Sequence, residues 1–207
     1  MNEQSMMFSP EVLFLLRKEI SSYIHCCLPG IISAFDADTQ TVSVQPALMA
    51  RFGEKVVHLP LLQKVPVVFP SAGGYSFLAV PQAGDECLVV FADGAIDRWM
   101  ATGQESVPPA ERQHDLSDGF AILGCWSQAH RKAGFPSAGC VMEKDDGTAG
   151  FKVNGAEVKA FTPSATITLN NGDVEIQGNL IINGTAYTEH KHSGVETGGG
   201  TTGGVTG

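Results

Sequence analysis

The last third of the chain contains short segments that alternate apolar and polar residues and are separated by Gly or Asn-Gly. The clearest segments are 151–155, 165–172, 173–178 and 179–184. Their apolar members fall on one face of each expected strand: Ile167, Leu169, Val174, Ile176, Leu180 and Ile182. Burying that face within one chain would need a second sheet, and too few residues remain to build it. The economical structure is several copies wound together around a shared axis, and the alternative is a hairpin packed on the preceding domain.

The residues before this region predict a helix followed by a small β domain. Ser9 is a good helix N-cap and Pro10 a good first-turn residue, and Pro29-Gly30 is expected to end the helix. Short alternating segments then predict strands at 31–35, 39–45, 56–59, 65–69, 75–80, 86–91 and 119–123. Their number and length fit a closed, OB-like barrel. Residues 94–114 are expected to form a long surface loop.

Composition excludes several classes of protein. The 207 residues carry a formal net charge of −9, which argues against a nucleic-acid-binding groove. The N-terminus lacks a signal peptide and no apolar run is long enough for a membrane helix, so synthesis as a soluble cytosolic chain is expected. Five cysteines without metal-binding spacing predict reduced, mostly buried thiols.

A His-x-His pair follows the alternating segments. In an extended chain, residues i and i+2 point to the same side, so His190 and His192 face one way and Lys191 the other. One chain offers two imidazoles, which is too few for a firm metal site. Three chains around a threefold axis would offer six nitrogens, an octahedral set that suits Fe(II) or Ni(II) better than tetrahedral zinc. The pattern therefore predicts one structural metal ion shared by three chains.

No arrangement of residues in the sequence predicts catalysis. There is no GxSxG, HExxH or P-loop motif and no paired Cys/His. Four histidines are scattered without visible partners: His25, His58, His114 and His130. A closed shell of six nitrogens would also leave no open position on a metal for water or substrate. The chain is expected not to be an enzyme, with no catalytic residues.

The sequence resembles the central spike (membrane-piercing needle) proteins of contractile-tailed bacteriophage baseplates and related injection systems. The resemblance rests first on the barrel segment, with motifs such as Pro81-x-x-Gly84-Asp85-Glu86 and the run from His114 to Phe120. It then includes the Gly- and Asn-punctuated strands. Its most specific part is the tail from His190 to Gly204, which begins with His-Lys-His-Ser-Gly.

The resemblance implies a mainly β homotrimer with four parts. These are an N-terminal helix (1–28), an OB-fold-like barrel (29–137), an intertwined trimeric β-helix shaft (138–187) and an apex with a glycine-rich tail (188–207). It implies His190 and His192 as ligands of one structural iron per trimer, held by six histidines. Some members bind calcium or chloride in the spike, but no calcium-ligand cluster is visible in this sequence.

The resemblance further implies a virion protein at the tip of the tail, made in the host cytoplasm. Its partners would be two further copies, the tail tube or baseplate hub protein, and the host outer membrane, which it would pierce on tail contraction. The alternative function is a trimeric OB-fold module that binds sugar or nucleic acid. That alternative would need basic and aromatic residues interleaved on the barrel strands, where Arg51, Lys55 and Lys64 are sparse.

Overall fold

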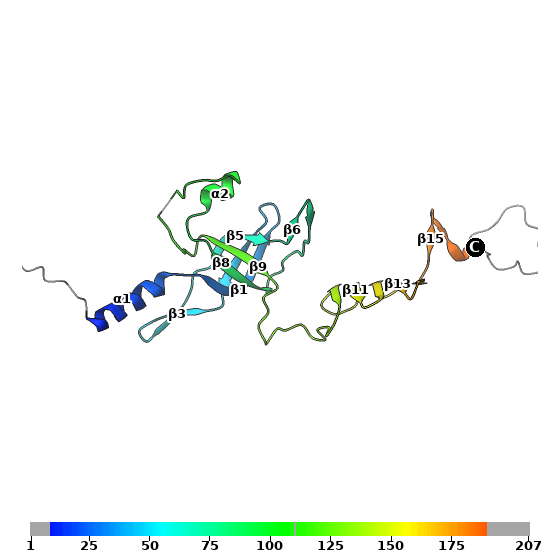
Figure 1. The fold of residues 1–207 in the computed structure, drawn as a ribbon, viewed down its shortest axis with the longest axis horizontal. Helices are drawn as coiled ribbons and strands as arrows, with labels where there is room; N and C mark the ends of the chain where they lie inside the picture. The colour runs from blue at the N-terminus through cyan, green and yellow to red at the C-terminus, as the bar shows by residue number, and fades with distance from the viewer. Residues whose placement is uncertain (1–8, 110, 190–207) are drawn as a thin grey trace, which may run out of the picture. The chain divides into compact units, whose positions relative to one another are not determined.

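The computed structural model describes residues 9–109 and 111–189. The chain divides into two compact units, Met1–Arg131 and Lys132–Gly207, and each is described by itself (Figure 1). The first unit contains a helix and the barrel strands. The second contains a separate set of short strands.

Helix α1 (Pro10–Tyr23) begins where the sequence predicts. The Ser9 hydroxyl accepts a hydrogen bond from the backbone N–H of Val12 at 3.4 Å, and Pro10 opens the first turn. The expected end at Pro29-Gly30 is wrong, because α1 ends at Tyr23 and both residues lie in strand β1 (Cys27–Asp36). There β1 already pairs with two other strands, so the backbone of these residues belongs to the sheet.

Five strands close into a barrel in the order β1-β2-β5-β9-β8, which confirms the predicted barrel. The other four strands are β2 (Thr41–Pro46), β5 (Leu62–Val68), β8 (Glu86–Phe91) and β9 (Gly119–Leu123). Strands β5 and β9 run parallel, and the other neighbours run antiparallel. The inward residues of these strands form one apolar core: Ile32, Val42, Val44, Leu62, Val65, Cys87, Val89, Phe91 and Ala121.

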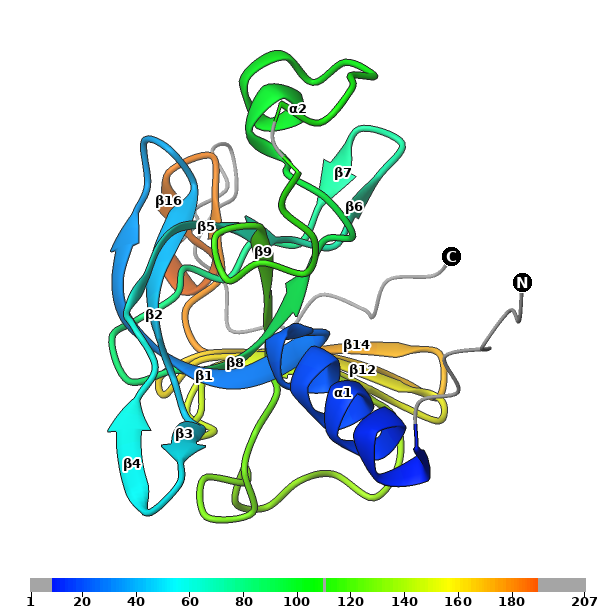
Figure 2. The same ribbon diagram turned by 90° about the vertical axis from the view of Figure 1, so that its left-hand side faces the viewer.

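Two hairpins extend from the barrel (Figure 2). One is formed by β3 (Met49–Phe52) and β4 (Lys55–His58), the other by β6 (Ser71–Ala72) and β7 (Tyr75–Ser76). The predicted strand at 75–80 is therefore largely wrong, since only its first two residues pair. Alternation marks a residue's face, but a strand also needs a partner, and β6 offers only two residues.

The stretch 94–114 is a surface loop as predicted, but it also contains helix α2 (Asp97–Thr102). The helix is held by the ring of Trp99, which packs edge-on against Phe120 with centroids 5.8 Å apart. Gly103 ends the helix in a left-handed conformation (φ 64°). The sequence prediction missed this helix because it has too few residues to show a helical period.

The second unit is built on a five-stranded antiparallel sheet in sequence order. Its strands are β10 (Cys140–Glu143), β11 (Gly150–Asn154), β12 (Glu157–Phe161), β13 (Thr166–Asn170) and β14 (Asp173–Gln177). Asn171 and Gly172 both take positive φ angles (51° and 88°), as a tight hairpin turn requires. These strands thus pair with one another within the chain. The intertwined three-chain shaft stays a prediction.

The described chain then ends in a small hairpin, β15 (Ile181–Ile182) and β16 (Thr185–Ala186), and a 3₁₀ turn, Tyr187–Glu189. No helix in the described ranges has the length and apolar character to cross a membrane.

All five cysteines are free. Only Cys87 is buried, so the prediction of mostly buried thiols is wrong.

Candidate functional site

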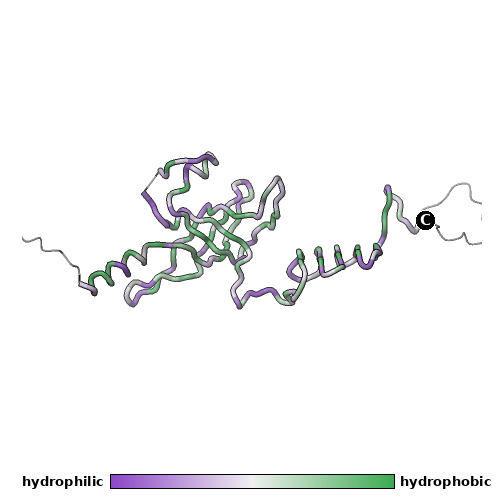
Figure 3. Tube along the Cα trace, in the orientation of Figure 1, coloured by the Kyte–Doolittle hydropathy of each residue, from purple (hydrophilic) through white to green (hydrophobic). Residues whose placement is uncertain are grey.

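The sheet of the second unit has one wholly apolar face. Residues directly opposite each other in neighbouring strands share a face, so the pairing of the strands assigns each side chain. Ten side chains, two from each strand, make up what we call the apolar face: Cys140, Met142, Phe151, Val153, Val158, Ala160, Ile167, Leu169, Val174 and Ile176. The alternation of apolar and hydrophilic residues along these strands is visible in Figure 3.

The apolar face is largely exposed in the single chain. Met142 and Val174 are each 64% exposed, and Ile167, in the strand next to the central one, is 49% exposed. Exposed apolar surfaces of this extent are unusual on monomeric proteins and mark sites of association. The predicted one-sided arrangement is confirmed for the four residues of β13 and β14, whereas Leu180 and Ile182 lie beyond this sheet.

All charged residues of these five strands lie on the opposite, polar face. The Glu143 carboxylate lies 2.7 Å from Lys152 Nζ, and this pair holds the pKa of Glu143 below its usual range. Lys152 Nζ also lies 4.9 Å from the centre of the Phe161 ring, a cation–π contact. The ion pairs therefore lie on the polar face, and the two faces of the sheet differ sharply in chemistry.

The predicted metal ligands His190 and His192 lie outside the described residues, directly after the turn Tyr187–Glu189. Their prediction stays untested by the structure. Within residues 9–109 and 111–189, no three His, Cys, Asp or Glu side chains come together as a metal site would need.

Two of the scattered histidines have carboxylate partners that the sequence did not reveal. His130 Nδ1 lies 2.8 Å from a Glu86 oxygen, and His114 Nε2 lies 3.2 Å from an Asp93 oxygen. Ser127 Oγ also approaches His130, at 3.5 Å, but on the same Nδ1 atom. A serine nucleophile and its acid must bind opposite nitrogens of the ring, so this Ser-His-Glu group lacks the geometry of a catalytic triad.

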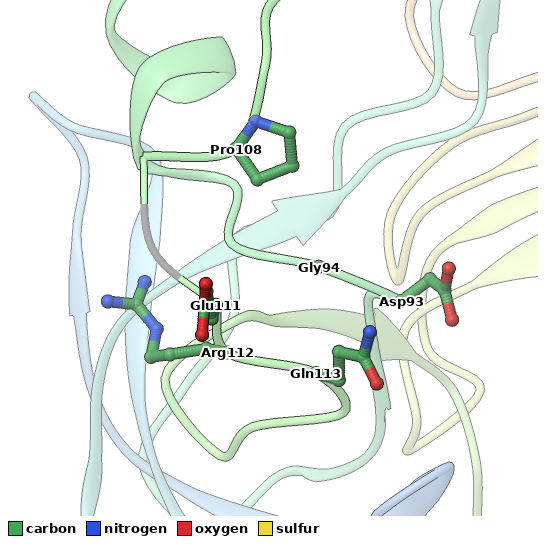
Figure 4. Close-up of a pocket in the computed structure, with 6 residues that line it drawn as sticks. All are labelled: Asp93, Gly94, Pro108, Glu111, Arg112 and Gln113. Atoms are coloured by element: carbon green, nitrogen blue, oxygen red, sulfur yellow. The ribbon is translucent and has the colours of Figure 1, made fainter.

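A cavity of about 500 Å³ lies beside the loop that carries α2, lined by the residues labelled in Figure 4. Its side chains do not converge: Asp93 and Arg112 point away from each other. The Arg112 guanidinium is already bound by Asp118, at 2.9 Å, and by Asp97. These contacts tie the loop to the barrel, and they leave no charged group of Arg112 free for a ligand.

Two protein families match the chain. The model of the Phage protein Gp138 N-terminal domain matches residues 28–124, which coincide with the barrel strands and their hairpins. The model of the GpV Apex motif matches residues 187–204, which include both predicted metal ligands. Both are parts of the phage central spike protein. The chain thus carries two parts of the phage central spike protein.

These two matches identify the chain as a structural component of the phage tail, and so of the virion. The apex motif is associated with metal binding at the tip of the spike. The two matches leave residues 125–186 between them, where the apolar face lies. None of the curated proteins matches the chain.

Proposed function

We propose that three copies of this chain form the non-enzymatic central spike of a contractile phage tail, which pierces the host outer membrane when the tail contracts. The apolar face of the second unit carries the proposal. It presents ten apolar side chains and no charge, while the charged residues of the same strands lie on the other side. Three such faces turned toward one axis would bury one another.

The composition of the two faces favours self-association over another partner. With a net charge of −9 per chain, copies repel each other unless they meet over uncharged surface, and the apolar face supplies it. Packing of face on face also needs no exchange of backbone hydrogen bonds, because each chain already pairs its own strands. The polar faces would then form the outer surface of the shaft.

The chemistry of the apex residues suits a structural metal. Two imidazoles separated by one residue give each chain two neutral nitrogen ligands, and three chains supply six in total. Iron is the metal we propose, with His190 and His192 of each chain as ligands. When bound, it would hold three chain ends together at the tip and resist their fraying under load. In this proposal the glycines that follow would let the chain turn where side chains would not fit.

The mechanism we propose is mechanical. Contraction of the sheath would drive the spike, docked on the tail tube or hub protein by its barrels, against the outer membrane. A narrow tip concentrates the force on a small area. Departure of the spike would then open the tube. Each step requires a stable trimer, and none requires a reacting group.

Elemental analysis of the purified protein tests the metal at the apex. We expect one iron per three chains in the wild type and none in the double variant His190→Ala, His192→Ala. The matched control is the double change His25→Ala, His58→Ala in the barrel unit, which should keep the metal. Metal that survives removal of both apex histidines, or a ratio of one metal per chain, would place the site elsewhere.

A further inference from the structure

The stretch from Gly124 to Gly139 joins the last barrel strand to the first strand of the second unit without a helix or strand. The boundary between the two units falls inside it, between Arg131 and Lys132. Such a stretch, with several glycines and exposed side chains, is typical of a flexible tether. The ion pairs of this stretch indicate instead that both of its halves are held in place.

On the barrel side, Glu86 at the start of β8 holds the chain that follows β9. One carboxylate oxygen accepts the backbone N–H of Ser127 at 2.5 Å, and the other lies 2.8 Å from His130 Nδ1. Ser127 and His130 are themselves closed into a turn, because the His130 N–H donates to the Ser127 carbonyl at 3.1 Å. The Glu86 side chain is only 15% exposed, whereas the His130 ring that it binds is 69% exposed, so the clamp is anchored on the barrel side by Glu86.

Two donors on one carboxylate also explain its acidity. They lower the pKa of Glu86 to about 2, with the Ser127 N–H as the largest cause and His130 next. The carboxylate therefore stays ionised across the physiological range of pH. As a carboxylate, Glu86 accepts from the Ser127 N–H, and it accepts from His130 where Nδ1 carries the proton.

On the sheet side, Lys132 is anchored within the second unit. Its Nζ lies 3.6 Å from Glu143 and 3.4 Å from Asp145. The Lys132 side chain is 11% exposed and that of Glu143 9%, so this pair is more enclosed than an ordinary surface ion pair. Glu143 is fixed in β10 and also binds Lys152, which completes the balance of charge around it.

We infer that the join between the two units is a doubly clamped hinge, in which Glu86 fixes the chain up to His130 and Glu143 fixes it from Lys132. Arg131 is then the one residue between the clamps. The freedom of the join is confined to the backbone around this residue, instead of being spread over the stretch from Gly124 to Gly139. Both clamps lie within a single chain, so the device does not depend on assembly into a trimer.

Limited digestion of the full-length protein with trypsin tests the hinge, because the protease cleaves after Arg131 and after Lys132. Cleavage requires local opening of the folded chain. We compare the wild type with Glu86→Gln and Glu143→Gln, which preserve side-chain shape and remove the charge. Glu105→Gln, on an exposed loop position, is the control. The fragments are quantified over time by mass spectrometry, and cleavage after Lys64 in β5 reports opening of the barrel itself.

Each clamp variant should be cleaved about tenfold faster at the hinge than the wild type, the effect expected when hydrogen bonds to a charged group are lost. Cleavage after Lys64 and the behaviour of Glu105→Gln should stay as in the wild type. Unchanged hinge cleavage in both variants would overturn the inference, and so would an equal increase after Lys64, which would mean general unfolding. Neither result bears on the trimer, which a mass measurement tests separately.

Discussion

Replacing one residue of the apolar face by an acid should dissociate the proposed trimer. Ile167 lies on this face in β13, next to the central strand β12, and is 49% exposed in the single chain. The change Ile167→Asp puts a carboxylate there in each of three chains. The neighbouring residue Thr168 lies on the polar face of the same strand, between Lys159 and Glu175, so Thr168→Asp is the matched control.

The size of the effect follows from the structure. Full burial of an isoleucine side chain contributes about 1.5–3 kcal/mol, so burying the exposed half on assembly contributes about 1 kcal/mol per chain. Three uncompensated carboxylates add a desolvation cost of several kcal/mol each. The trimer should therefore lose on the order of 10 kcal/mol in total, or several powers of ten in its association constant.

Sedimentation equilibrium at micromolar concentration measures the outcome. Ile167→Asp should sediment as a single chain, and Thr168→Asp should keep the mass of the wild type. Thermal unfolding of the barrel, followed in both variants, shows whether the first unit is still folded. If Ile167→Asp assembles like the wild type, the apolar face is not the contact surface, and if both variants dissociate, the polar face takes part as well.

Three further predictions concern the barrel and the apex. Gly30→Ala would place a Cβ 2.3 Å from the buried Val44, so thermal unfolding should show a loss of about 1–3 kcal/mol in the free energy of unfolding. The control Gly94→Ala would place its Cβ no closer than 3.5 Å to any atom beyond its neighbours in the chain and should leave the stability unchanged. Asp118→Ala removes a 1% exposed carboxylate that binds Arg112 and should cost about 2–3 kcal/mol in denaturant unfolding at neutral pH. Arg112 lowers the pKa of the Asp118 carboxyl. The stabilisation that Asp118 gives the folded state is therefore present above about pH 4 and is lost as the pH falls through the lowered pKa. A difference in unfolding free energy between wild type and Asp118→Ala that does not change with pH would contradict this reasoning. Since neutral imidazoles are the proposed ligands, iron should be released as the pH falls below about 6.5, and iron that stays bound down to pH 4 would argue against histidine ligands.

Much of the barrel could be predicted from its sequence because alternation reports which side chains face a core. The segments 86–91 and 119–123 are predicted strands and form β8 and β9 with the same bounds. What alternation cannot report is the partner of a strand. The segment 75–80 is a predicted strand, but only Tyr75 and Ser76 pair, where β6 runs beside them.

The loop contacts were beyond prediction for a related reason. Asp118 and Arg112 come together across a turn, and Glu86 meets His130 from a distant part of the chain. Such pairs depend on the closed barrel bringing separate segments together, and no local pattern in the sequence marks them. The same holds for Trp99, whose packing on Phe120 fixes a helix too short to show a period.

The apolar face was predicted where its strands alternate cleanly, as in β13 and β14, and missed in β10 and β12. In β12 the apolar residue Phe161 lies on the polar face, where Lys152 covers its ring. It therefore breaks the alternation of apolar and polar residues that Val158 and Ala160 begin. The His-x-His pair is visible in the sequence alone, and the residues that match the apex motif include it. Its role as a ligand set remains part of the proposal.

The mass of the full-length protein in solution tests the central claim most directly. Sedimentation equilibrium or light scattering at micromolar concentration should give three times the chain mass of 21.9 kDa, without dependence on concentration over the measured range. A mass of one chain at these concentrations would contradict the account, because the apolar face would then be left exposed to water and no shaft could form.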